Sequence, residues 1–216
     1  MSTARRKEGL IFDLDGTLVD SLADIATAIN LTRGTFGLAA LPAPHIIAQV
    51  GDGSDHLVRQ TVPVPPERRV EALAAYLAHY ERHMLDGTHL MPGVLDVLER
   101  YRDRHLAVVT NKLQHLAEKV LVGLGIRDRF AIVVGGDSLP RKKPDALPLL
   151  HVLEHCGLRP EQAVMIGDGV NDVLAAQAAG VMAVAVTFGV AGDAELRALS
   201  PDFVVHDLSA ILEIID

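Results

Sequence analysis

The sequence predicts an α/β fold in which a helical insert interrupts a parallel β-sheet. Short apolar runs rich in β-branched residues alternate with segments whose apolar residues recur at helical spacing, as parallel strands joined by helical crossovers require. One stretch, from 21 to about 84, breaks this alternation because it carries helical patterns and no convincing strand. Polar residues follow the apolar runs directly, where ligands bind in open parallel sheets.

The apolar runs define a Rossmann-like sheet flanked by helices. Strands are expected at 10–14, 106–110, 132–134, 164–166, 183–186 and 203–205. Helices are expected between them at 94–102, 113–124, 146–156 and 172–179, and in the insert at 22–31 and 70–83. Asp20 and Ser21 can cap the first helix of the insert.

The composition limits the classes to which the protein can belong. With 216 residues and 49% hydrophobic composition it can bury a substantial core, and its one cysteine, Cys156, excludes an internal disulfide. The formal net charge of −8 argues against nucleic acid or an anionic membrane as a partner. The sequence has neither an apolar run long enough to span a membrane nor the apolar segment of a secretory signal, so a cytoplasmic location is expected.

Two aspartates follow the first predicted strand. Asp13 and Asp15 stand two positions apart, which directs both carboxylates to the same side of an extended chain. One can attack an electrophile while the other moves a proton. Acidic pairs are common at solvated turns, but here an apolar strand precedes the pair and Gly16 and Thr17 follow it, offering backbone N–H groups and a hydroxyl to a phosphate. The segment therefore predicts a catalytic pair beside a phosphate site.

A second acidic pair predicts a metal site. Asp168 and Asp172 lie where the strand at 164–166 leads into a helix, so both carboxylates can converge on a hard cation such as Mg²⁺. The structural alternative makes Asp168 a turn residue and Asp172 an acid favoured near a helix N-terminus. The occurrence of both acidic pairs in one chain favours Mg²⁺.

Such a site also needs a positive side chain. A phosphate dianion near a carboxylate is repelled by roughly 4 kcal/mol per pair of unit charges at about 4 Å and an effective dielectric of about 20. With Asp15 protonated and the other three aspartates ionised, one Mg²⁺ and one lysine bring the site to about neutral. Lys143, which precedes Pro144 on a short loop, is the candidate, and periodicity alone leaves Lys142 as an alternative.

Thr110 and Asn111 end the strand at 106–110 with a hydroxyl and an amide that can reach the non-bridging oxygens of a phosphate. Both residues can also cap the following helix. The two roles are compatible, because a helix N-terminus attracts phosphate for the same reason that it needs a cap.

In this order, the motifs resemble those of the haloacid dehalogenase superfamily and, within it, the phosphoglycolate phosphatases. The segment 13–21 resembles the first motif of the superfamily, Thr110-Asn111 the second, Lys143-Pro144 the third and 167–172 the fourth. The resemblance covers nearly the whole chain.

The resemblance implies an enzyme, a Mg²⁺-dependent phosphoric monoester hydrolase. Asp13 would form an aspartyl-phosphate, while Asp15 would protonate the leaving oxygen and then activate water. The metal would be held by the Asp13 carboxylate, the Asp15 backbone carbonyl and Asp168, with Asp172 supporting directly or through water.

By the same resemblance, Thr110 and Lys143 would bind the transferring phosphoryl group. The insert resembles the helical cap of the superfamily, so residues 21–87 are predicted to form a cap domain over a catalytic core of 1–20 and 88–216.

Two further segments point to the substrate. Gly51, Asp52 and Gly53 resemble the cap loop that faces the core in phosphoglycolate phosphatases, and Arg59 is a candidate partner for a substrate carboxylate. The stretch 136–145 resembles the same group and favours 2-phosphoglycolate as the substrate.

Other functions use similar residues. A phosphatase for another small phosphoester, such as a sugar phosphate or pyrophosphate, or a sugar-phosphate mutase would keep the same fold. A phospho-accepting receiver module is shorter, lacks a helical insert and needs no Asp15. A haloacid dehalogenase proper needs neither that acid nor a metal. A small phosphorylated metabolite is the expected partner, and the choice between monomer and homodimer stays open.

Overall fold

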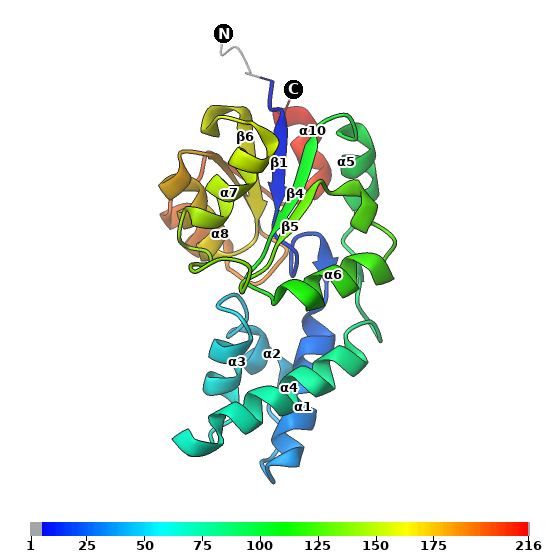
Figure 1. Ribbon diagram of the computed structural model, residues 1–216, viewed down its shortest axis with the longest axis vertical. Coiled ribbons are helices and arrows are strands. Elements are labelled where there is room, and N and C mark those ends of the chain that lie inside the picture. Colours follow the sequence, from blue (N-terminus) through cyan, green and yellow to red (C-terminus); the bar gives the residue numbers. More distant parts are fainter. Residues whose placement is uncertain (1–5, 216) are drawn as a thin grey trace.

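A six-stranded sheet with the strand order β5-β4-β1-β6-β7-β8 runs through the upper part of the molecule (Figure 1). In this computed structural model, which describes residues 6–215, its strands are β1 (Gly9–Phe12), β4 (His105–Val109), β5 (Ile132–Val134), β6 (Ala163–Gly167), β7 (Met182–Val186) and β8 (Phe203–Val205). Every neighbouring pair is parallel. The predicted α/β class is confirmed, and each predicted strand is present to within two residues.

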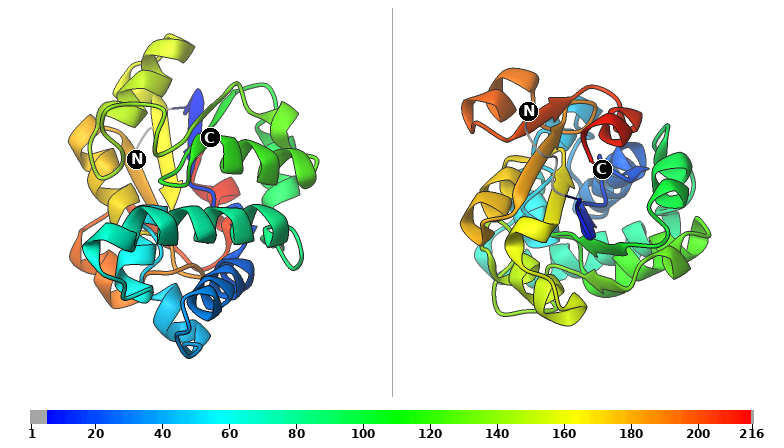
Figure 2. Two further views of the ribbon diagram at one scale, coloured as in Figure 1. Left: turned by 60° about the horizontal axis from the view of Figure 1, so that its bottom comes forward. Right: turned by 90° about the horizontal axis from the view of Figure 1, so that it is seen from above.

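Helices cover both faces of the sheet, which explains why the central strands are apolar throughout rather than alternating. One face carries α7 (Leu147–Cys156), α8 (Val170–Ala179) and α9 (Asp193–Ala198). The other carries α5 (Val94–Arg100), α6 (Gln114–Gly123) and α10 (Ile211–Ile214). The view from above shows the sheet between these two layers (Figure 2).

The helical insert leaves the sheet after β1 and lies beyond the carboxyl ends of the strands (Figure 1). It consists of α1 (Leu22–Thr35), α2 (Ala43–Ile47), α3 (Ser54–Thr61) and α4 (Arg69–His83). Its longest helices, α1 and α4, pack against each other. The predicted limits of a cap domain, 21–87, enclose these helices.

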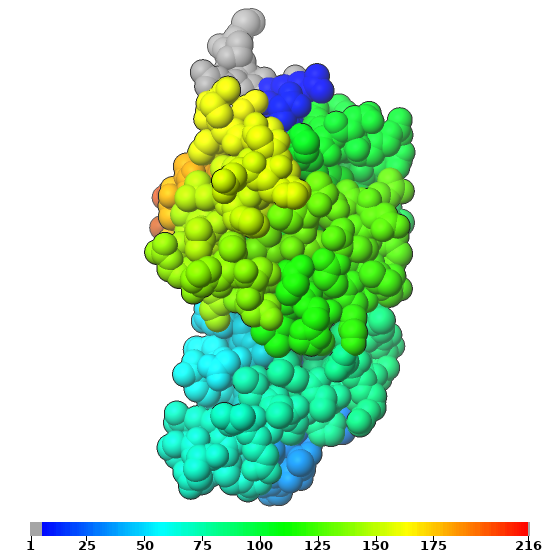
Figure 3. All heavy atoms as spheres, viewed as in Figure 1, coloured from blue at the N-terminus to red at the C-terminus, as the bar shows by residue number. Residues whose placement is uncertain are grey.

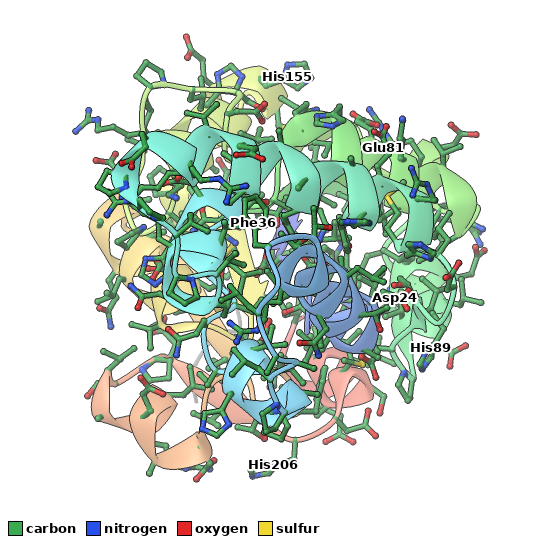
Figure 4. All side chains as sticks on the ribbon, turned by 90° about the horizontal axis from the view of Figure 1, so that it is seen from below. Asp24, Phe36, Glu81, His89, His155 and His206 are labelled. Atoms are coloured by element: carbon green, nitrogen blue, oxygen red, sulfur yellow. The ribbon has the colours of Figure 1, made fainter. Side chains whose placement is uncertain are left out.

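A short antiparallel pair that the sequence did not predict, β2 (Val19–Asp20) and β3 (His89–Leu90), joins the two crossings between insert and core. Asp24, in the first turn of α1, accepts hydrogen bonds from the backbone N–H groups of Gly87 and Thr88 and from the Thr88 hydroxyl, at 2.8–3.1 Å. Figure 4, viewed from the insert's end, shows Asp24 and His89 on the same side of the molecule. The two segments that connect insert and core, 19–24 and 87–90, are therefore held side by side by these hydrogen bonds.

A second contact joins insert and core away from the crossings. Glu81 on α4 and Lys119 on α6 form an ion pair, and the surfaces of the two parts meet on the face that Figure 3 draws. None of the helices within residues 6–215 has both the length and the apolar character needed to cross a membrane.

Candidate active site

Polar side chains from four segments meet at the carboxyl edge of the sheet. Asp13 and Asp15 follow β1, Thr110 follows β4, Asp168 follows β6, and Lys143 comes from the loop before α7. All five line one cavity of about 440 Å³ that lies between this edge and the insert. The parallel arrangement of β1, β4 and β6 brings these ends together, as expected for an open α/β sheet.

Three carboxylates form a cluster that could hold a metal ion. One oxygen each from Asp13, Asp168 and Asp172 lies within 4.8 Å of the other two. Asp168 is fixed in place, because Thr17 Oγ1 donates to its Oδ1 at 2.7 Å and the Val190 N–H donates to its Oδ2, also at 2.7 Å. Clustered carboxylate oxygens of this kind suit a hard divalent cation.

Lys143 supplies the positive charge of the cluster. Its Nζ lies 2.9 Å from Asp13 Oδ1 and 2.5 Å from Asp172 Oδ1, and it donates to the Val109 carbonyl at 2.6 Å. Its side chain is only 2% exposed. The alternative, Lys142, is exposed and its Nζ donates to the Asp52 carbonyl instead. The structure thus brings Lys143 to the carboxylates, where the sequence left both lysines open.

The cluster carries excess negative charge. Burial raises the pKa of Asp168 to about 8, and the charges of Asp13 and Asp172 add to this effect. Burial likewise raises the pKa of Asp13 to about 6, with Asp172 adding and Lys143 opposing. For Lys143, burial alone would lower the pKa, but the carboxylates of Asp13 and Asp172 outweigh it and raise the pKa. When all three carboxylates are ionised they exceed the one ammonium by two charges, which a divalent cation would neutralise.

Asp15 lies outside this cluster and has its own partners. Lys112 Nζ donates to both of its carboxylate oxygens, at 2.6 and 2.8 Å, and Ser21 Oγ donates to Oδ1 at 2.5 Å. The sequence predicted that Ser21 caps α1. Ser21 is the N-cap residue of α1, but its side chain makes no capping hydrogen bond. Sequence reasoning also missed Lys112, although it directly follows Thr110 and Asn111.

Gly16 and Thr17 do not form the predicted phosphate site. Thr17 is fully buried and its hydroxyl is committed to Asp168. The Gly16 N–H donates to the Val19 carbonyl within the turn, and a Cβ at Gly16 would come within 2.3 Å of Asp168 Oδ2. The two residues bring the turn close to Asp168, and the structure does not offer the Thr17 hydroxyl or the Gly16 N–H to a phosphate as the sequence predicted.

Thr110 lines the cavity, and its Oγ1 accepts from the Lys112 N–H at 3.2 Å, which leaves its own proton available to an oxygen in the cavity. Asn111 serves differently, because its amide donates to the carbonyls of Gly51 and Lys143 at 2.8 and 3.0 Å. The sequence predicted that this amide binds phosphate, but in the structure the loop at Gly51 lies within hydrogen-bond distance of it. Neither residue caps the following helix, which begins at Gln114.

The loop of the insert that carries Gly51, Asp52 and Gly53 lines the cavity as predicted. Asn171, at the start of α8, donates to Asp52 Oδ1 at 2.8 Å and to the Gly51 carbonyl at 3.3 Å. Together with the bonds from Asn111 and Lys142, these contacts fasten the loop onto the core. The insert thereby closes one side of the cavity.

Arg59 lies elsewhere. Its guanidinium pairs with Asp55 at 2.9 Å on the surface of α3, where its side chain is 49% exposed. It lines a separate cavity of about 200 Å³ and does not line the one at the carboxylates. The structure therefore does not bring Arg59 to the cavity in which a substrate carboxylate was expected to meet it.

The insert also contributes the apolar wall of the cavity. Ile25, Leu57, Tyr76 and Tyr80 line it, and the two tyrosine rings stack with centroids 5.8 Å apart. The Tyr80 ring lies 4.6 Å from Lys112 Nζ. This wall faces the charged edge of the sheet across a small space.

The fold and the site define an enzyme-like class: an α/β sheet with carboxylates gathered at its carboxyl edge beneath a helical insert. Residues 10–186 match the family of haloacid dehalogenase-like hydrolases, and the chain belongs to this family.

Individual relatives are more specific. The chain is 40% identical to a phosphoglycolate phosphatase of Chromobacterium violaceum, over 96% of each chain. It is 39% identical to a phosphoglycolate phosphatase of Psychrobacter arcticus, over 96% of this chain and 95% of the other. A crystal structure of a predicted phosphoglycolate phosphatase from Haemophilus somnus superposes with a TM-score of 0.92 at 30% identity, covering 96% of this chain and 97% of the other. The protein is thus an enzyme, a hydrolase similar to phosphoglycolate phosphatases.

Proposed function

We propose that the protein is a cytoplasmic, Mg²⁺-dependent phosphatase that hydrolyses 2-phosphoglycolate through an aspartyl-phosphate on Asp13. The observation that supports this most strongly is the cluster of Asp13, Asp168, Asp172 and Lys143, placed beside a second acid, Asp15, in one small cavity. The substrate is suggested by the names of the relatives. A small phosphorylated metabolite also suits a cavity of about 440 Å³.

The carboxylates of Asp13, Asp168 and Asp172 and the backbone carbonyl of Asp15 would hold the metal. When bound, Mg²⁺ would offset the negative charge that substrate and carboxylates bring together. The donor set fits, since it consists of oxygens with two uncompensated negative charges.

In the first step, a carboxylate oxygen of Asp13 attacks phosphorus and the bond to the glycolate oxygen breaks. That oxygen takes a proton from Asp15. Lys143 and the Thr110 hydroxyl stabilise the transferring phosphoryl group. Glycolate is released and the phosphoryl group remains on Asp13.

In the second step, Asp15 takes a proton from water, and the resulting hydroxide attacks phosphorus. The bond to Asp13 breaks, which releases phosphate and restores the carboxylate. Asp15 must therefore be ionised at this stage. Lys112 and Ser21 direct three hydrogen bonds to its oxygens, an arrangement suited to the carboxylate form.

The test is phosphate release from 2-phosphoglycolate, compared with a panel of sugar phosphates and pyrophosphate, in Mg²⁺ and in EDTA. We expect 2-phosphoglycolate to give the highest kcat/KM, EDTA to abolish turnover, and Asp13→Asn to be inactive. Mass spectrometry of protein quenched during turnover should find phosphate on Asp13 alone. Substantial activity of Asp13→Asn, or turnover unaffected by EDTA, would refute the mechanism.

A further inference from the structure

The proposed substrate carries a carboxylate next to its phosphate, and a carboxylate enclosed with several aspartates needs a cation. Among the described residues that line the cavity, only Lys112 and Lys143 have basic side chains. Lys143 is already shared between Asp13 and Asp172. Within residues 6–215, Lys112 forms an ion pair with Asp15 alone. Because Asp15 carries a proton in the proposed first step, the charge of Lys112 is then available to the second anionic group of a substrate.

Lys112 is placed for this task beside Asp15, whose carboxylate is not part of the cluster of Asp13, Asp168 and Asp172. Its side chain is 5% exposed, and its ammonium lies between Asp15 and the face of the Tyr80 ring. Two of its three N–H donors reach the oxygens of Asp15. The third has no acceptor oxygen among the described residues.

The chemistry of the substrate matches this position. In 2-phosphoglycolate a single methylene separates the carboxylate from the ester oxygen that Asp15 would protonate. A group that contacts Asp15 is therefore next to the carboxylate once phosphorus is aligned with Asp13. The cation–π contact with Tyr80 holds the ammonium on this side without neutralising it.

We propose that Lys112 binds the carboxylate of the substrate and is the residue that selects a carboxylated phosphoester over an uncharged one. This inference rests on the proposed function. Lys112 takes the role of carboxylate partner that the sequence assigned to Arg59, because Arg59 pairs with Asp55 on the surface of the insert. Lys142 is not a candidate for this role, because its ammonium is bound to the backbone carbonyl of Asp52.

The experiment compares two substrates that differ only at the relevant group: 2-phosphoglycolate, and ethyl phosphate, in which a methyl group stands in place of the carboxylate. For Lys112→Met we expect kcat/KM to fall roughly 10- to 100-fold more for 2-phosphoglycolate than for ethyl phosphate, mainly through KM. Both substrates lose whatever Lys112 contributes through Asp15, so only the difference between them reports carboxylate binding. Arg59→Met is the matched control and should leave the ratio of the two kcat/KM values unchanged.

Two further measurements guard against a purely structural effect. Lys112→Gln keeps hydrogen-bond donors for Asp15 but removes the charge, and should show the same selective loss. In the inactive Asp13→Asn background with Mg²⁺, calorimetry should show that Lys112→Met weakens the binding of 2-phosphoglycolate much more than that of inorganic phosphate.

An equal fall for both substrates would overturn the inference, because Lys112 would then act only on Asp15. Wild-type enzyme that hydrolyses other phosphoesters but not 2-phosphoglycolate would instead refute the proposed substrate before any Lys112 variant is made. The two failures are therefore distinguishable.

Discussion

The two sides of the cavity differ in kind. The core side presents Asp13, Asp168, Asp172 and Lys143, all on segments that follow buried strands or lie against them, and all linked by ion pairs or close oxygen contacts. The insert side presents aromatic and aliphatic side chains and the backbone of Gly51–Gly53, fastened by hydrogen bonds to carbonyl groups.

This difference suggests a division of labour. Charged groups that must keep their positions during phosphoryl transfer lie at the edge of the sheet, whereas the insert encloses the cavity and limits the access of water to it. Changes on the core side should therefore affect chemistry and metal binding. Changes on the insert side should affect access and KM.

The largest effect should follow from a change on the core side. Asp15→Asn preserves shape and removes the proton donor and acceptor, so kcat should fall roughly 10²- to 10⁴-fold. Steady-state phosphate release measures this. Calorimetry should find Mg²⁺ binding intact, since the backbone carbonyl of residue 15 is unchanged. A loss smaller than about tenfold would remove Asp15 from the proposed mechanism.

The next effect is the pH dependence that Asp168, in the metal cluster, gives to the free energy of unfolding. Burial raises the pKa of Asp168 to about 8 from an ordinary 3.8, so the metal-free folded protein keeps a proton that the unfolded chain has lost. This contribution to the free energy of unfolding is complete below about pH 4 and is lost as pH rises through the folded pKa, by up to about 1.4 kcal/mol per pH unit.

Urea unfolding between about pH 5 and 8 in EDTA measures that slope. Asp168→Asn should flatten it, because an amide does not titrate. Saturating Mg²⁺ should flatten it too, since a bound cation favours the ionised carboxylate. A slope identical in wild type and variant would show that Asp168 does not hold the proton.

On the insert side, Gly53→Ala should hinder the close approach of the loop 51–53 to the core. Gly53 has a φ of +81° and a Cβ there would come within 2.9 Å of the Asn111 carbonyl oxygen. We expect kcat/KM to fall about tenfold, with Mg²⁺ binding unchanged. Gly37→Ala is the matched control, since Gly37 also has a positive φ, +69°, but open space around it. Equal kinetic effects in both would mean that the close approach to the core is irrelevant.

The smallest effect should come from the side chain that holds the loop. Asn171→Ala removes the hydrogen bonds to Asp52 and Gly51, and KM should rise about two- to tenfold with little change in kcat. Asn171→Asp should raise KM further, because it places a like charge beside Asp52. If the alanine variant lowered kcat and left KM unchanged, the loop would be part of the chemistry and the proposed division of labour would be wrong.

Much of the core could be predicted from the sequence, because strands buried on both faces must be apolar along their whole length. The short helices α2, α3, α9 and α10 could not, since so few residues form a helix only when tertiary packing supports them. The placement of Asp13, Asp15 and Asp168 followed from their positions at strand ends. The position of Arg59 away from the cavity could not be predicted, because a helical pattern does not reveal which face of α3 meets the cavity.

The sequence by itself determined the sheet, the insert and the edge at which the acidic groups gather, since parallel strands end on the same side whatever their side chains bond to. Only the tertiary structure decided which side chains form hydrogen bonds with one another at that edge. Thr17 donates to a carboxylate 151 positions away, and Lys112 to one 97 positions away. Hydroxyl and ammonium groups can serve many acceptors, so the choice depends on distances between segments that local sequence does not encode.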